Sequence, residues 1–170
     1  MERFCIGKPD AVSVLMGAND VQNTPYEDAE ARIGQFMREL DALIASVHEY
    51  DAALDVIVNL PVCGAEQYAW GLRGNSSAKR YRLNTMLLSR AILERWDGRE
   101  EEHVHICPMR LFVDPVFGFD RAYYRANPYS DQTVCRQSNW VHPNAAGYCQ
   151  MGDALAGTVE KLRRTEQARE

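Results

Sequence analysis

Apolar residues are spaced in two patterns along the chain, and the first pattern predicts three strands. Short, nearly continuous apolar runs extend from Ala11 to Met16, from Leu54 to Leu60 and from Val104 to Cys107. Apolar runs of this length are typical of strands that are buried on both faces of a parallel sheet. The second and third runs are followed at once by Pro61 and Pro108, and proline cannot continue a central strand.

The second pattern, apolar residues three and four positions apart, predicts three helices. The first helix extends from about Tyr26 to Val47, the second from near Ala78 to Trp96, and the third from Asn144 to about Leu162. The apolar stripe of the first helix consists of Ile33, Phe36, Met37, Leu40, Leu43, Ile44 and Val47. The charged segment from Arg163 to Glu170 is expected to be a frayed tail.

This alternation of strands and helices predicts one α/β domain with a parallel sheet that helices cover on both faces. A length of 170 residues fits a single domain. In such sheets, ligands bind beyond the carboxyl ends of the strands. The segments in which to look for a site are therefore 17–23, 61–77 and 108–143. Within the last of these, Met109 to Ser138 has no sustained periodicity and is expected to be a long functional loop.

Charge and cysteine content narrow the class of protein. The formal net charge of −5 and the pI of about 5.4 favour solubility and argue against nucleic acid or an anionic membrane as a partner. The cysteines are dispersed without a CxxC pair, so no zinc site or redox motif is predicted, and no metal or cofactor is expected. These cysteines are Cys5, Cys63, Cys107, Cys135 and Cys149. With no export signal and no transmembrane-length apolar run, we expect a cytoplasmic or virion-associated protein.

The first candidate for chemistry is the sequence Gly17-Ala18-Asn19-Asp20, where the first predicted strand ends. A glycine permits a left-handed turn there, and Asn19 would direct its side-chain amide into the crevice beyond the sheet. An amide donor in that place would stabilise the oxyanion of a tetrahedral intermediate. The alternative is a simple turn in which Asp20 hydrogen-bonds to its own backbone.

The second candidate is Asn139-Trp140-Val141-His142-Pro143, which precedes the last predicted helix. Pro143 restricts His142 to an extended backbone and then opens the helix, which would present the imidazole at the mouth of the crevice as a general base. Asn139 is close enough in sequence to orient the ring across a turn. The alternative is an ordinary surface histidine near a helix start.

Together, the two motifs resemble blocks of the SGNH (GDSL-type) hydrolase family. Residues 8–20 are similar to the third block, whose asparagine donates to the oxyanion hole, and residues 139–148 to the fifth block, whose histidine is the catalytic base. The resemblance extends from about Lys8 to Leu162. It implies a three-layer α/β/α, flavodoxin-like fold and hydrolysis of carboxylic esters of lipids or acylated sugars. It also implies that Asn19 is the oxyanion donor, His142 the base and Asn139 the residue that orients the base.

The fifth block of this chain departs from the family pattern. The family usually has an aspartate where this chain has Asn139. An asparagine can orient an imidazole, but it cannot stabilise the imidazolium charge as a carboxylate does. Asp114 and Asp131, in the long third loop, are therefore alternative partners for His142.

The nucleophile of the family is not visible in the chain. Its serine block, and a block with a glycine oxyanion donor, would both precede Lys8, so the resemblance implies an N-terminally incomplete domain whose serine comes from upstream sequence or a partner. Ser76 and Ser77 adjoin a predicted helix start, where serine is an ordinary N-cap. The family's first strand would lie beside Ala11 to Met16, so this strand would be an exposed edge that pairs with a complementary chain or self-associates.

Aromatic residues of the long third loop and its flank are candidates for substrate binding. Tyr124, Tyr129 and Trp140 would line a sugar or acyl pocket, together with the backbone at Gly17. The expected partner is then a small-molecule or carbohydrate ester. The alternative is that these rings pack the loop onto the sheet.

Two other functional classes remain open. A non-catalytic SGNH-like module, which binds carbohydrate or serves in phage assembly, would keep the fold without the reaction. A nucleotide-binding flavodoxin-like protein ranks last, because no Gly-rich or Ser/Thr-rich phosphate loop follows any predicted strand.

Overall fold

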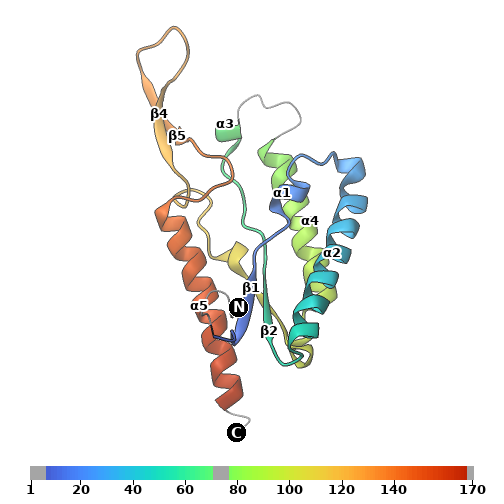
Figure 1. The fold of residues 1–170 in the computed structure, drawn as a ribbon. Coiled ribbons are helices and arrows are strands. Elements are labelled where there is room, and N and C mark those ends of the chain that lie inside the picture. The colour runs from blue at the N-terminus through green and yellow to red at the C-terminus, as the bar shows by residue number, and fades with distance from the viewer. Residues whose placement is uncertain (1–6, 71–76, 168–170) are drawn as a thin grey trace.

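The computed structural model describes residues 7–70 and 77–167. Within these residues, β1 (Ala11–Val14), β2 (Asp55–Asn59) and β3 (Val104–Cys107) form a parallel sheet in the order β1-β2-β3 (Figure 1). The register of the first pair places Val12 beside Val56. The three predicted strands are confirmed, although the first two are shorter than expected.

Three long helices accompany the sheet, namely α2 (Ala29–Tyr50), α4 (Ala78–Trp96) and α5 (Ala145–Gln167). A 3-10 turn, η2 (Tyr26–Asp28), leads directly into α2. These are the helices that the apolar spacing predicts, and α5 continues beyond Leu162 to Gln167. No helix in the described part of the chain is both long enough and apolar enough to cross a membrane.

Polar side chains explain where α4 and α5 begin. Ser77 Oγ accepts the amide N–H of Arg80 at 3.1 Å, and Asn144 Oδ1 accepts the amide N–H of Gly147 at 2.9 Å. Each bond satisfies an N–H that has no partner within the first helical turn. The N-cap interpretation of Ser77 is confirmed, whereas Ser76 lies outside the described residues.

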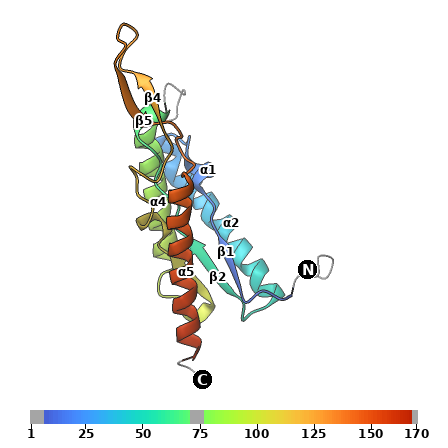
Figure 2. The same ribbon diagram turned by 90° about the vertical axis from the view of Figure 1, so that its left-hand side faces the viewer.

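Each face of the sheet carries its own apolar core. On one face, Phe36 of α2 and Leu88 of α4 belong to a cluster with Val56; on the other, Ala154 of α5 belongs to a cluster with Ile57. Neighbouring strand residues serve opposite faces because successive side chains of a strand alternate. The fold is therefore mixed α/β, with α2 and α4 on one side of the sheet and α5 on the other (Figure 1 and Figure 2), which is compatible with an α/β/α arrangement.

The segment from Met109 to Ser138, expected to be a long loop, contains regular structure. After a 3-10 turn, η4 (Met109–Leu111), the strands β4 (Arg121–Arg125) and β5 (Thr133–Gln137) form an antiparallel hairpin. Figure 1 and Figure 2 show this hairpin projecting beyond the end of the molecule where α5 begins. The expectation of a loop throughout is wrong because exposed and half-buried residues alternate along β4, so the sequence offers no buried apolar face to recognise.

Gln137, at the end of β5, fixes the hairpin to the rest of the molecule, and it is 2% exposed. Its Nε2 donates to the carbonyls of Pro115 at 2.7 Å and Val116 at 2.9 Å. Its Oε1 accepts the amide N–H of Glu66, and its own amide N–H donates to Glu66 Oε1 at 2.9 Å. This buried amide joins the hairpin, the 115–116 turn and the segment before α3 (Gln67–Trp70), and so sets where residues 139–143 leave the hairpin.

Candidate functional site

A cavity of about 330 Å³ lies at the carboxyl ends of β1 and β2. It is formed by the turn after β1, the segment after β2, one residue of α4, the turn that leads into α5 and two residues of α5. Gly17 and Asn19 line it together with His142, so the two motifs identified in the sequence lie at one cavity. The lining residues are Leu15, Met16, Gly17, Ala18, Asn19, Asp20, Pro61, Val62, Tyr81, Val141, His142, Pro143, Tyr148 and Met151.

The turn after β1 requires a glycine at position 17. Gly17 has a φ of 92°, in the left-handed region that residues with a Cβ rarely adopt. A Cβ there would lie 2.6 Å from Leu88 Cδ2 and 2.9 Å from Phe36 Cζ. The glycine therefore lets the chain turn against the core and start α1 (Ala18–Val21), which places the exposed Asn19 at the cavity.

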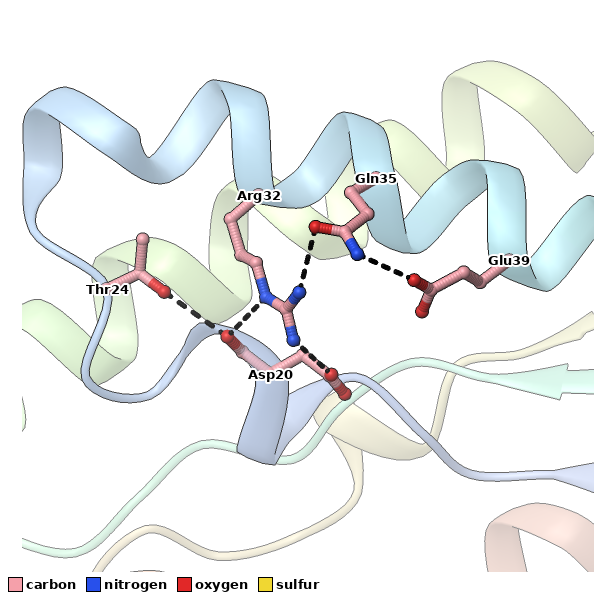
Figure 3. A network of polar contacts seen from close by, with 5 residues as sticks. All are labelled: Asp20, Thr24, Arg32, Gln35 and Glu39. Atoms are coloured by element: carbon pink, nitrogen blue, oxygen red, sulfur yellow. Dashed lines mark hydrogen bonds and ion pairs between the residues drawn. The ribbon is translucent and has the colours of Figure 1, made fainter.

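Helix α1 is held in place by Arg32 of α2 and by Thr24, which follows α1 (Figure 3). The Asp20 carboxylate accepts from Arg32 Nη2 at 2.8 Å, and the Asp20 carbonyl accepts from Thr24 Oγ1 and Arg32 Nε, both at 3.2 Å. Arg32 Nη1 donates to Gln35 Oε1 at 3.0 Å, and Gln35 Nε2 donates to Glu39 at 2.9 Å. The Asp20 side chain is thus paired with α2 rather than with its own turn, and this pairing holds the backbone of α1, which carries Asn19.

A second turn shapes the histidine side of the cavity. Asn139 Oδ1 accepts the amide N–H of His142 at 3.2 Å. The asparagine therefore supports the main chain of the histidine, whereas the sequence predicted a contact with its ring. Pro143 is buried and forms an isolated antiparallel β-bridge with Phe119 at the base of the hairpin. These contacts hold His142 at the cavity with an exposed side chain.

The two carboxylates considered as partners of His142 are engaged elsewhere. Asp114 Oδ1 accepts the amide N–H groups of Phe117 at 3.0 Å and Val116 at 2.7 Å, and these hydrogen bonds lower the pKa of Asp114. The Asp131 side chain is 99% exposed on the hairpin, where its Oδ1 lies 3.6 Å from an arginine. Neither carboxylate lines the cavity.

The segment after β2 forms one wall of the cavity, and side chains from elsewhere anchor its carbonyl groups. Arg110 donates to the carbonyl of residue 61 at 3.2 Å, and Tyr81 donates to that of residue 62 at 3.3 Å. Arg82 Nη2 donates to the carbonyls of residues 64 and 65 at 3.2 and 3.1 Å. Burial raises the pKa of Tyr81 to about 12, so its hydroxyl remains a donor at neutral pH. Sequence reasoning missed these residues because a tyrosine or an arginine in an amphipathic helix, or an arginine in a short turn, has no feature that distinguishes it from its neighbours.

The described lining contains no serine, threonine or cysteine, and Asp20 is its one carboxylate. Ser77 caps α4, and Ser13 Oγ accepts from Asn59 Nδ2 at 2.8 Å. Cys63 follows the wall residue Val62, and burial raises the pKa of its thiol. A thiol with a raised pKa is a poor nucleophile at neutral pH.

The aromatic residues expected to bind substrate do not line the cavity. The ring of Tyr124 packs edge-on against Tyr68 of α3, with 4.9 Å between the ring centroids. Tyr129 is 98% exposed in the connection between β4 and β5. Trp140 is half-buried and packs against the core beneath α5 and against the cluster around Tyr81. The structure thus places Gly17, Asn19 and His142 at one cavity and leaves these three aromatic rings outside it.

Comparisons with models of known families, with curated proteins and with solved structures found no match to this chain. In the described ranges, no group of three or more His, Cys, Asp or Glu side chains is arranged to hold a metal ion. The chemistry of the site therefore has to follow from the cavity and its lining.

Proposed function

We propose that this cavity is the base and oxyanion half of an SGNH-type site, on a flavodoxin-like fold, that hydrolyses carboxylic esters of acylated sugars or lipid-like molecules. The observation that supports the proposal is the cavity shared by Asn19 and His142, which are far apart in the sequence. It lies at the carboxyl ends of parallel strands, where α/β sheets bind their ligands.

In the proposed reaction, His142 is the general base. Its imidazole takes the proton of a hydroxyl that attacks the ester carbonyl, and returns a proton to the departing alcohol. Asn19 Nδ2 donates to the carbonyl oxygen as that oxygen becomes an oxyanion. Asn139 is a positioning residue that acts through the main chain of His142. The attacking hydroxyl is a serine from outside the described residues, and water replaces it when the chain acts alone.

Hydrolysis of 4-nitrophenyl acetate by the purified chain tests this assignment. We expect His142→Ala to lower the rate at least about tenfold, because general bases contribute this much or more. His103→Ala is the matched control, since it removes another partly exposed imidazole, 40% exposed, which does not line the cavity. Equal rates for wild type and His142→Ala would overturn the proposal, as would an equal loss in both histidine variants.

A non-catalytic carbohydrate-binding or assembly module is the second candidate. The observation that favours it is the hairpin, on which Tyr123 is 76% exposed and Tyr129 98% exposed. Large exposed aromatic surface on a projecting element is typical of an interaction site. Polysaccharide binding that is lost in a Tyr123→Ala/Tyr129→Ala variant, with no ester turnover by wild type, would favour this candidate over the hydrolase.

We also propose that the outer edge of β1 pairs with a second copy of the chain. Within the described residues, β1 has β2 on one side and no strand on the other. Leu15 and Met16, which follow it and line the candidate site, are 44% and 50% exposed. Unpaired apolar edges readily recruit another strand. Native mass spectrometry over a range of concentrations should detect a dimer of the full chain, and a monomer at every concentration would contradict this pairing.

A further inference from the structure

A second cavity, of about 500 Å³, lies along β3, between this strand and α5, and shares no lining residue with the candidate ester site. It is bounded by the first residue of β2, by β3 and the segment after it, by the end of α4 with the 3-10 turn η3 (Glu100–Glu102), and by α5 from Asp153 to Thr165. Its apolar wall includes Trp96, Val104, Ile106, Phe112 and Leu162. This volume is in the range of pockets that hold small organic ligands.

Two histidines and an aspartate form a polar cluster in this cavity. Asp55 Oδ1 lies 2.9 Å from His103 Nδ1 and 2.9 Å from His105 Nε2. The side chains of Asp55 and His105 are only 13% and 11% exposed. Because an ionised carboxylate can only accept, both rings donate to it. The other nitrogen of each neutral ring, His103 Nε2 and His105 Nδ1, is then a hydrogen-bond acceptor.

The charged residues of the lining are mostly acidic. Its carboxylates are those of Asp55, Asp97, Glu100 and Asp153, and Lys161 is its one ammonium group among the described residues. The two arginines nearest the end of α4 are paired outside the cavity, Arg95 with an aspartate of α2 and Arg99 with a glutamate of η3. The cavity therefore combines apolar walls with an excess of negative charge and of acceptors, which complements a cation.

Trp96 contributes an aromatic ring to the apolar wall at the end of α4. Its ring already contacts two cations, with the guanidinium carbons of Arg95 and Arg99 at 4.7 and 5.8 Å from the ring centroid. Trp96 is 6% exposed, so its ring forms a part of the wall with little surface open to solvent.

We propose that this cavity binds an organic ammonium ion with an apolar body. The ammonium group donates to the acceptors around Asp55 and is attracted by the carboxylates, and the apolar body packs against the wall that includes Trp96 and Phe112. This binding site is independent of the proposed ester hydrolysis, because no residue lines both cavities.

The first test uses 2-phenylethylammonium as the probe and the full chain in amine-free phosphate buffer, with binding measured by isothermal titration calorimetry. We expect the ammonium probe to bind at least about tenfold more tightly than uncharged 2-phenylethanol, which has the same apolar body. His142→Ala should bind it as wild type does. No binding of the ammonium probe, or equal affinity for the two probes, would overturn the proposal.

Two glycines of α5 provide a matched pair of blocking variants. Gly157 lines the cavity, Gly152 does not, and a Cβ added at either would meet no atom within 4 Å. Leucine is a better helix former than glycine, so both Gly157→Leu and Gly152→Leu should fold with an unchanged or higher unfolding temperature. We expect Gly157→Leu to lose binding of 2-phenylethylammonium, because its side chain enters the cavity. Binding that survives in Gly157→Leu, or is lost equally in Gly152→Leu, would place the ligand elsewhere.

Removal of one negative charge tests the electrostatic part of the proposal without filling the cavity. Asp153→Asn changes a carboxylate of the lining, whereas Glu30→Gln changes an exposed carboxylate on α2, outside the cavity. The affinity for the ammonium probe should fall severalfold in Asp153→Asn and remain at the wild-type value in Glu30→Gln. Equal affinities in these two variants would show that charge does not select the ligand.

Discussion

Gly17→Ala is expected to lower the free energy of unfolding by about 3 kcal/mol, a change of about 150-fold in the ratio of folded to unfolded chains. Part of the loss comes from the backbone, because a residue with a Cβ at a φ of 92° is strained. The rest comes from packing, because the new methyl group would lie 2.6 Å from Leu88 Cδ2 and 2.9 Å from Phe36 Cζ. Urea-induced unfolding, followed by tryptophan fluorescence, measures the change.

Gly98→Ala separates these two contributions. Gly98 also has a positive φ, 73°, but a Cβ there would meet no atom within 4 Å. This variant should therefore lose only the backbone contribution, about 1 kcal/mol. Equal losses for Gly17→Ala and Gly98→Ala would show that the core between α2 and α4 accommodates the methyl group without cost, which would contradict the close packing described for the turn after β1.

The elements that the sequence predicts best are those whose burial follows a simple period. Val56 in β2 and Leu88 in α4 are both 0% exposed, and Ile92, one helical turn after Leu88, is 1% exposed. Each belongs to an apolar run or stripe that most other conformations would expose to water, which is unfavourable. The same periodicity, together with the rule for parallel sheets, predicts that the turn after β1 and the turn before α5 meet at one end of the sheet.

Buried polar residues are the features that periodicity does not predict. Asn84 is 0% exposed on α4, where an amphipathic pattern would assign an asparagine to the side that faces water. Its Nδ2 donates to the carbonyls of Val21 and Thr24, both at 2.8 Å, and so ties α4 to the segment between α1 and α2. Its burial depends on acceptors that lie far away in the sequence and that only the folded chain brings within reach.

In the candidate site, too, residue positions are predictable from the sequence, whereas side-chain contacts are not. The sequence identifies Asn19 and His142, because their positions at strand and helix ends follow from the α/β pattern. It does not predict that Asn139 contacts the main chain of the histidine, nor that Tyr81 reaches the wall after β2. The direction of a side chain in a turn depends on contacts from other elements, and those contacts have no sequence period.

Gln137→Leu is expected to lower the free energy of unfolding by about 3 kcal/mol, because each buried group left without a partner costs about 1–3 kcal/mol. Leucine is close to glutamine in size, so the cavity created is small. The substitution leaves the carbonyls of Pro115 and Val116 and the amide N–H of Glu66 without their present partner. Urea unfolding measures the global change. Hydrogen exchange should show reduced protection of the Glu66 amide even at low denaturant.

Gln35→Leu is the matched control, because Gln35 is an exposed glutamine on α2 whose side-chain hydrogen bonds are also exposed. Its stability should remain within about 0.5 kcal/mol of wild type. If Gln137→Leu were equally neutral, the buried amide would not be what fixes the hairpin to the 115–116 turn.

Because the chain runs directly from Gln137 to Asn139 and His142, local opening at this residue should also lower ester hydrolysis in Gln137→Leu under conditions where the protein remains folded. The hairpin and the cavity would then behave as one unit, and a hydrolysis rate unchanged in Gln137→Leu would show that the turn carrying His142 is held independently of the hairpin.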